Sequence, residues 1–320
     1  MTSTTDRATL RDWCQLVRLP NVFTVLADTT AAFLLVAQEL DPVARYVLVI
    51  ASVVFLYWSG MILNDLWDLE VDRRERPGRP LPAGRIQVAA ARRAGWGLLL
   101  FGILLAGLAG YFPVEGVGGG FLPAGVAILL AISVVLYDGP VKRTPFAPIM
   151  MGACRFFSFL LGASAAMTAV GAFPFFSNHV LIIAAGFGIY IGGVTLMARG
   201  EAVGGERLPL ISGFAVTIIG LAIIAAGPQF ADGGIVFRIE PQRQFPLLIG
   251  LLAFTIIHRA MRAVADPQPR AIQLNIKHAI LTLIPLSAAV SLLSAGPVAG
   301  LLVFALAVPA MTLGSFLRVT

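Results

Sequence analysis

The sequence predicts an all-α bundle of helices that spans a membrane as a single domain over residues 1–320. Hydrophobic residues make up 58% of the chain and charged residues 12%, whereas a soluble domain carries about a quarter charged residues. Most apolar runs are 15 to 25 residues long, which suits helices that cross a hydrocarbon core of about 30 Å. The runs do not alternate between apolar and polar residues, as the strands of a transmembrane β-barrel do.

Eight apolar runs, taken in order, each predict one transmembrane helix after a polar N-terminal segment, residues 1–19. They are residues 20–38, 44–64, 88–111, 121–137, 146–169, 179–198, 208–227 and 245–264. The last apolar stretch, residues 276–314, is split by the sequence SAGP at 294–297, and proline interrupts the interior of a helix. This stretch forms either one broken helix or two short ones, so we expect nine transmembrane helices, or ten.

Arg and Lys residues gather on one side of the predicted bundle. With the N-terminus in the cytoplasm, the cytoplasmic segments hold 18 of the 23 basic residues, and the opposite side holds Arg45, Arg238 and Arg243. Loops rich in Arg and Lys tend to stay in the cytoplasm. We therefore expect a multi-pass protein of the inner or plasma membrane with a cytoplasmic N-terminus. The net charge of +6 follows from this topology, and without a basic-aromatic binding module we expect no nucleic-acid partner.

The segment LNDLWDLEVDRRERPGRPLPAG, residues 63–84, concentrates charge at the cytoplasmic end of the second predicted helix. If that helix continues to its last aspartate, a turn of 100° per residue places four polar side chains within an arc of about 100°. These are Asn64, Asp65, Asp68 and Asp72. The spacing predicts one acidic stripe, with Asp65 and Asp72 about 10 Å apart along the helix axis.

Three carboxylates on one helix face repel each other at the rim of a bilayer and need a positive counter-charge. Ligands that are all oxygen select a hard cation, and Mg²⁺ typically shares itself between carboxylates and substrate phosphates. The arginines that follow, Arg73, Arg76 and Arg79, can grip phosphate oxygens. The stripe therefore indicates a Mg²⁺–phosphate or Mg²⁺–diphosphate site. An ordinary interfacial loop accounts for the arginines but not for the carboxylate spacing.

The pattern N-D-x-x-D-x-x-x-D-R, followed by R-P-x-P-x-G-R, resembles the first aspartate-rich motif of the UbiA superfamily of intramembrane prenyltransferases. Here the pattern runs from Asn64 to Arg73 and from Arg79 to Arg85. The helix number and the place of the motif after the second helix are also similar. The resemblance implies a bundle around a central cavity that opens to lipid. It also implies Mg²⁺-dependent transfer of an isoprenoid chain from a polyprenyl diphosphate to an aromatic or other lipophilic acceptor.

The segment LYDGPVKRTPFAP, residues 136–148, resembles the Tyr…Lys-Arg segment of the same family. The resemblance implies that Lys142 stabilises the departing diphosphate and that Arg143 binds substrate, because a compact ammonium suits a leaving group of high charge. Tyr137 is expected to orient the diphosphate or to stabilise a carbocation. The alternative is an ordinary basic loop in which Tyr137 is an interfacial aromatic anchor.

The segment RLPNVFT, residues 18–24, resembles the entry to the first helix of the family, and it places Arg18 and Asn21 at the rim of the site as substrate-binding residues. Asp28 and Arg155 lie inside predicted membrane helices, where ionisable side chains are costly and usually face the bundle interior. Arg155 is therefore a candidate substrate-binding residue. Pairing between the two buried groups is the alternative.

The place of the second aspartate-rich motif of the family departs from the pattern. It reads TLMARGEAVGGERLP, residues 195–209, and contains no aspartate. Glu201 can replace one carboxylate ligand, or Arg199 can instead replace the second metal as a fixed positive charge. Glu201 is also the one general base that the sequence suggests. ARGEA and LYDGPVKRTP resemble the EboC branch, whose gene cluster is linked to the export of metabolite precursors, which implies membrane or gene-cluster partner proteins.

The sequence thus predicts a Mg²⁺-dependent prenyltransferase with Asp65, Asp68 and Asp72 as metal ligands. Catalytic roles are expected for Lys142, Arg73, Arg79, Arg199, Glu201 and Tyr137, and substrate-binding roles for Asn64, Asn21, Arg18, Arg143 and Arg155. The alternative is a membrane protein of the same fold that binds or moves a lipophilic precursor without chemistry. A third hypothesis is a structural partner in a membrane complex, which would tolerate the loss of Asp65 and Asp68.

Overall fold

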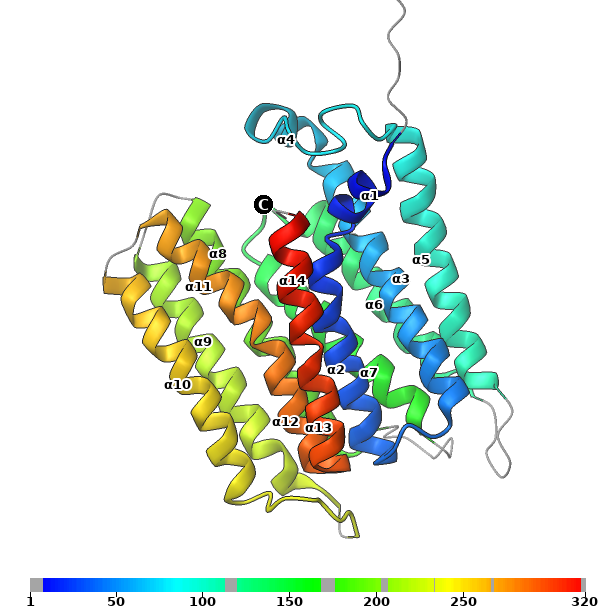
Figure 1. Ribbon diagram of the computed structural model, residues 1–320, viewed down its shortest axis with the longest axis vertical. Coiled ribbons are helices and arrows are strands. Elements are labelled where there is room, and N and C mark those ends of the chain that lie inside the picture. Colours follow the sequence, from blue (N-terminus) through cyan, green and yellow to red (C-terminus); the bar gives the residue numbers. More distant parts are fainter. Residues whose placement is uncertain are drawn as a thin grey trace, which may run out of the picture.

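A bundle of long helices forms the chain (Figure 1). The structure is a computed structural model, and it describes residues 8–112, 120–167, 176–202, 207–232, 234–265 and 268–317. These ranges contain helices and no strand. Ten helical stretches within them are long and apolar enough to cross a membrane. The predicted class, an all-α integral membrane bundle, is confirmed.

Eight long helices agree with the eight predicted apolar runs to within a few residues at most ends. They are α2 (Val22–Ala37), α3 (Val43–Trp67), α5 (Val88–Tyr111), α6 (Leu122–Leu136), α7 (Ala147–Ala166), α8 (Asn178–Ala202), α9 (Arg207–Ala226) and α10 (Gln244–Ala265). The short turns η1 (Leu19–Asn21), η2 (Tyr137–Val141) and η3 (Gly227–Phe230) extend α2, α6 and α9. The eight long helices agree with the sequence because their apolar composition is unbroken over the thickness of a membrane.

The C-terminal region forms two full-length spans, one of 26 and one of 21 residues. The first comprises α11 (Pro269–Leu281) and α12 (Leu283–Ala295), and the second comprises α13 (Pro297–Ala305) and α14 (Ala307–Leu317). The break at Gly296, with a φ of 92°, lies where it was predicted. The C-terminal helical region was expected to start at residue 276, which was wrong. The short lengths expected for two separate helices were also wrong. The first turns of α11 are polar, but Ile272, Asn275 and Ala279 form a buried helical face, which hydropathy alone does not detect.

Two short helices lie at one end of the bundle, α1 (Leu10–Leu16) and α4 (Leu69–Glu75), as Figure 1 shows. The helix α1 was not expected from the sequence. Its signal is a capping box, in which Asp12 donates its backbone N–H to the Thr9 hydroxyl and the Asp12 carboxylate accepts the Thr9 backbone N–H. Arg85 donates to the Asp12 carboxylate at 2.6 Å, so α1 is fastened to the loop that follows α4.

The predicted continuous helix through the acidic stripe is wrong at one residue. Asp68 lies between α3 and α4 with φ −86° and ψ 1°, outside helical geometry. Its backbone N–H still donates to the Asn64 carbonyl at 3.0 Å, and its own carbonyl accepts from the Asp72 N–H at 2.8 Å. The chain therefore bends at Asp68 without losing its hydrogen bonds, and α4 leaves the axis of α3 (Figure 1).

Glycines bring α7 close to two neighbours. A Cβ atom on Gly162 would lie 2.3 Å from the carbonyl oxygen of Thr29 in α2, and one on Gly152 would lie 2.7 Å from that of Gly188 in α8. Small residues at such contacts let helix backbones approach closely in membranes. The polar residues of α7 are therefore held against α2 and α8 in the bundle interior.

Candidate functional site

The bend at Asp68 brings carboxylates together that a straight helix would separate. One nitrogen of the Arg79 guanidinium, Nη1, lies 2.7 Å from Asp72 Oδ2 and 3.6 Å from Asp65 Oδ1. Arg18, which precedes α2, lies 3.2 Å from the same oxygen of Asp65. The predicted separation of about 10 Å between Asp65 and Asp72 therefore does not describe their carboxylates, because Arg79 reaches both.

Lys142 joins a second segment to this group of side chains. It follows the π-helical turn η2 and donates to Asn64 Oδ1 and to Asp68 Oδ2. The acidic stripe and the basic segment between α6 and α7 are thus brought together, although more than seventy residues separate them. We call Asn64, Asp65, Asp68 and Asp72 with Arg18, Arg79 and Lys142 the charged cluster.

Burial explains the pairing within the charged cluster. Asn64, Asp65 and Asp72 are buried, and Asp68 is partly buried. A buried charge is costly unless it is paired and hydrogen-bonded. Three carboxylates therefore meet three cationic side chains, and the counter-charge that the stripe requires comes from the chain itself.

The donor types of the charged cluster suit a hard cation. The stripe offers one amide oxygen and three carboxylates, the ligands that Mg²⁺ prefers in proteins. In the described ranges, no three acidic, His or Cys side chains are grouped closely enough to hold a metal ion. Arg18, Arg79 and Lys142 take that place in this structure, so a metal would bind by exchange with these cations.

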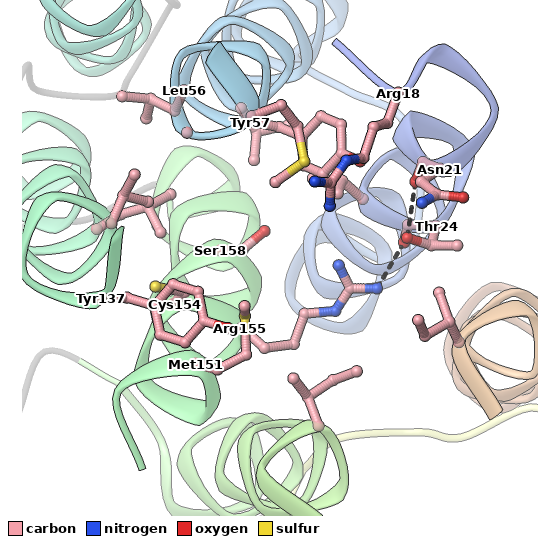
Figure 2. Close-up of a pocket in the computed structure, with 18 of the residues that line it drawn as sticks. Arg18, Asn21, Thr24, Leu56, Tyr57, Tyr137, Met151, Cys154, Arg155 and Ser158 are labelled. Carbon is pink, nitrogen blue, oxygen red and sulfur yellow. Dashed lines mark hydrogen bonds between the residues drawn. The ribbon is translucent and has the colours of Figure 1, made fainter. Parts of the chain in front are cut away.

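A cavity of about 240 Å³ extends into the bundle beside the charged cluster. Its walls come from α2, α3, α6, α7, α8 and the junction of α11 with α12. Figure 2 shows the side chains of Arg18 and Arg155 directed toward the cavity, with Tyr57 close to Arg18. Arg18 both lines the cavity and pairs with Asp65. The apolar cavity and the charged cluster are therefore parts of one site.

Asp28 and Arg155 pair with each other, as the alternative interpretation expected. Arg155 Nε lies 2.7 Å from Asp28 Oδ2, and Arg155 Nη2 donates to the Thr24 carbonyl at 3.1 Å. Asp28 has no exposed surface, whereas Arg155 lines the cavity. The pair therefore places a guanidinium at the cavity wall and neutralises its charge from behind.

Several predicted site residues lie outside the charged cluster. Arg73 is exposed and pairs with Glu70 at 2.6 Å, and Arg143 is exposed on the loop after η2. Arg199 donates to the backbone carbonyls of Lys142 and Thr144, so it holds the loop that carries Lys142. Tyr137 and Asn21 line the cavity. The side chain of Glu201 lies outside the described part of the structure.

The polar cavity residues that the sequence did not indicate include Asp138 and Ser158. The sequence predicts that Asp138 lies in the segment after a helix ending at residue 137, but the π-helical turn η2 continues α6 and buries it. The available signal was an acidic residue directly after a long apolar run and beside Tyr137. Ser158 gave no signal, because a single serine in an apolar helix is common.

Comparison with known proteins identifies the family. The model of the UbiA prenyltransferase family matches residues 25–281. The chain belongs to this family. A curated relative, the digeranylgeranylglyceryl phosphate synthase of Metallosphaera sedula, is 28% identical over 136 residues, which are 42% of this chain and 44% of the relative. The chain thus matches less than half the length of that UbiA-family relative.

Solved UbiA structures share the fold over most of the chain. A structure of a digeranylgeranylglyceryl phosphate synthase has a TM-score of 0.64 at 19% identity and covers 90% of this chain and 99% of its own. A UbiA homolog from Archaeoglobus fulgidus, bound to GPP and Mg²⁺, has a TM-score of 0.58 at 18% identity and covers 85% of this chain and 99% of its own. At these identities the likeness shows a common fold.

Proposed function

We propose that the protein transfers an isoprenoid chain from a polyprenyl diphosphate to a lipophilic acceptor in a Mg²⁺-dependent reaction. The observation that carries this proposal is the junction of the charged cluster with the apolar cavity through Arg18. A prenyl diphosphate has a highly charged head and an apolar tail, and this site offers a separate environment for each. The charged cluster binds the head, and the cavity takes the first part of the tail.

The chain's own residues divide the work of the proposed reaction. Asp65, Asp68 and Asp72, together with Asn64, would hold Mg²⁺, which when bound neutralises charge on the diphosphate. In this proposal Lys142, Arg79 and Arg18 turn from the carboxylates to the phosphate oxygens once that charge is balanced. Fixed cations at the leaving group favour its departure. The apolar cavity walls keep water from the allylic carbon.

Other predicted residues take supporting roles in this proposal. Arg199 is a positioning residue, because it bonds the backbone of the Lys142 loop. Tyr137 and Asn21 face the transferred chain from the cavity wall. Arg73 and Arg143 attract the anionic donor from the surface.

The relatives support the choice of donor and leave the acceptor open. The curated relatives are named digeranylgeranylglyceryl phosphate synthases, and the Archaeoglobus fulgidus homolog was solved with GPP and with DMAPP, each together with Mg²⁺. We infer a prenyl diphosphate donor for this chain from those names and from the charged cluster. The likeness to the EboC branch, and with it a partner protein from a gene cluster, stays a prediction.

We further propose that the end carrying α1 and α4 faces the cytoplasm. These helices, the C-terminal end of α8 and the N-terminal end of α11 lie at one end of the bundle in Figure 1. Most of the basic residues belong to this end, and positive loops are retained in the cytoplasm. The donor site would then open to cytoplasmic diphosphates.

A second candidate function is binding or transport of an isoprenoid without chemistry. The observation that favours it is the absence of aspartate from residues 195–209, where a second metal-binding motif would lie. Arg199, from this segment, is engaged with backbone carbonyls. The charged cluster argues against this candidate, because a carrier of a neutral lipid does not need charged side chains that bind a diphosphate.

The proposal is tested by binding of a non-hydrolysable geranylgeranyl diphosphate analogue to detergent-purified protein, with and without Mg²⁺. The variant Asp65→Asn/Asp68→Asn removes two carboxylates, and Glu70→Gln is the matched control because Glu70 is exposed and outside the cluster. We expect binding that needs both Mg²⁺ and the two aspartates and is unchanged in the control. If the folded protein binds no analogue across several chain lengths, the prenyltransferase proposal fails and the carrier becomes the leading function.

A further inference from the structure

Two buried side-chain atoms of the cavity lining have neither a hydrogen-bond partner nor an ion-pair partner. They are Oδ2 of Asp138 in η2 and Oγ of Ser158 in α7. Asp138 is 4% exposed and Ser158 is 5% exposed. Figure 2 shows Ser158 on the wall formed by α7, above Arg155. Buried polar atoms are nearly always hydrogen-bonded, and leaving one unsatisfied costs free energy. These two atoms therefore mark a place where a ligand group can complete the hydrogen bonding.

Three other polar groups at this wall already have partners. Arg155 is neutralised by Asp28 and donates to a backbone carbonyl. Arg18 pairs with Asp65, and the Thr24 hydroxyl donates to the Asn21 carbonyl at 2.8 Å. None of these three groups donates to Asp138 Oδ2.

Asp138 lies beside Gly60 of α3, and both residues line the cavity. The charged groups near enough to act electrostatically on Asp138 are Arg18, Lys142, Asp65 and Asp68, all from the charged cluster. Asp138 is therefore placed between the proposed diphosphate site and the apolar cavity, where the bond to the transferred chain would form.

We propose that Asp138 accepts a hydrogen bond from the hydroxyl group of a neutral, lipophilic alcohol or phenol acceptor and takes its proton during transfer. This inference rests on the proposed prenyl transfer. The acceptor oxygen forms a C–O bond with C1 of the isoprenoid, and the bond from C1 to the diphosphate oxygen breaks, its electron pair leaving with the diphosphate. The hydroxyl proton passes to Asp138 Oδ2. The products are a prenyl ether, diphosphate and a protonated Asp138 carboxyl.

The chemistry of the wall selects this class of acceptor. A hydroxyl can donate to Asp138 and accept from Ser158, which satisfies both unpartnered atoms. A carboxylate would meet Asp138 with a like charge and would find Arg155 already paired. The remaining wall is mostly apolar, with residues such as Leu56, Leu130 and Val134, so the body of the acceptor is apolar too.

The test is equilibrium binding of 4-butylphenol and 4-butylanisole to detergent-purified protein, without Mg²⁺ or diphosphate. The two probes have similar shapes, but only the phenol donates a hydrogen bond. We expect the wild type to prefer the phenol by up to about tenfold, the effect of one buried hydrogen bond. Asp138→Ala removes the acceptor and should abolish the preference. Thr195→Ala is the matched control, because Thr195 lines the cavity but donates to the Ile191 carbonyl of its own helix.

Asp138→Asn provides a second variant of nearly unchanged shape. Its amide group can donate to the ether oxygen, so the difference between the two probes should also narrow there. Equal affinity of the wild type for both probes, or a preference that survives both substitutions at Asp138, would overturn the inference. Because this assay contains neither donor nor metal, its outcome is independent of the diphosphate-analogue experiment that tests prenyl transfer.

Discussion

Lys142 and Asp68 form an ion pair that ties the segment after α6 to the bend between α3 and α4. Both side chains are partly buried, and Lys142 also donates to Asn64. The ammonium thus takes the position that a metal ion would need at the stripe. The Lys142 ammonium and a metal ion compete for Asp68, whereas the ammonium and a diphosphate attract each other.

Replacing Lys142 by Met should therefore have opposite effects on two ligands. Mg²⁺ binding in the absence of donor should strengthen roughly tenfold, about 1.4 kcal/mol, because Asp68 loses its competing partner. Binding of the diphosphate analogue should weaken, because a cation at the leaving group is gone. Calorimetric titration measures both affinities. Lys277→Met is the control, since Lys277 is exposed on α11. Parallel changes in the two affinities would contradict the competition.

Arg79 makes a different contribution, because it holds Asp72 inside the structure. The Asp72 side chain is 5% exposed and that of Arg79 12% exposed, so the pair lies largely out of water. Arg79→Gln leaves a buried carboxylate without its main cation, which costs about 3 kcal/mol or more when such a pair is broken. We expect a clear fall in the midpoint of thermal unfolding in detergent.

The double variant Arg79→Gln/Asp72→Asn separates pairing from other effects of Arg79. Removing both charges should restore part of the stability, because no uncompensated carboxylate remains buried. Arg76→Gln is the matched control, because Arg76 is exposed. A double variant as unstable as the single one would show that Arg79 acts through contacts other than Asp72.

The close contact of α7 with α2 predicts a size limit at Gly162. A methyl group there would press on the Thr29 carbonyl, so Gly162→Ala should destabilise the protein by about 1–3 kcal/mol, as overpacking does. Gly97→Ala in α5 is the control, because a Cβ on Gly97 meets no atom within 4 Å and alanine favours helix. Thermal unfolding of both variants in one detergent measures the difference. Equal stability would show that α7 can shift without cost.

The sequence predicted helices well where apolar composition persisted over a membrane thickness, as in α5 and α8. It failed where other forces determine structure. The polar start of α11 is helical because one face packs on α8, and α1 exists because of a capping box. Such contacts involve residues that are distant in the sequence, and the hydropathy of a local segment carries no information about them.

The candidate site was predictable in kind but not in arrangement. The spacing of Asp65, Asp68 and Asp72 indicated a shared face, yet the bend at Asp68 and the reach of Arg79 determine which oxygens meet. Asp138 was hidden because a π-helical turn, not a loop, carries it. Packing between helices determines turn geometry of this kind, and the amino-acid composition of the turn itself gives little indication of it.

The N-terminal cap predicts a local dependence on pH. The Thr9 hydroxyl, which donates to the Asp12 carboxylate at 2.6 Å, lowers the pKa of Asp12 against the opposing effect of burial, and Arg85 adds to the lowering. A lowered pKa means that the charged form stabilises the fold. This stability is complete above the ordinary value of 3.8 and is lost as pH falls through the lowered pKa. Arg85 is too exposed for its ion pair to add much.

Asp12→Asn should therefore loosen α1 at neutral pH and have little further effect in acid. Hydrogen exchange over residues 10–16 should be faster in the variant by roughly fivefold to tenfold at pH 7, about 1 kcal/mol for a lost cap. As pH falls through the lowered pKa and the carboxyl of the wild type takes up its proton, the wild type should come to exchange at nearly the rate of the variant. Asp41→Asn, at an exposed residue between α2 and α3, should leave exchange in α1 unchanged over the whole acid titration. A difference between Asp12→Asn and wild type that persists undiminished throughout the acid titration would show that the charge of Asp12 does not hold the cap.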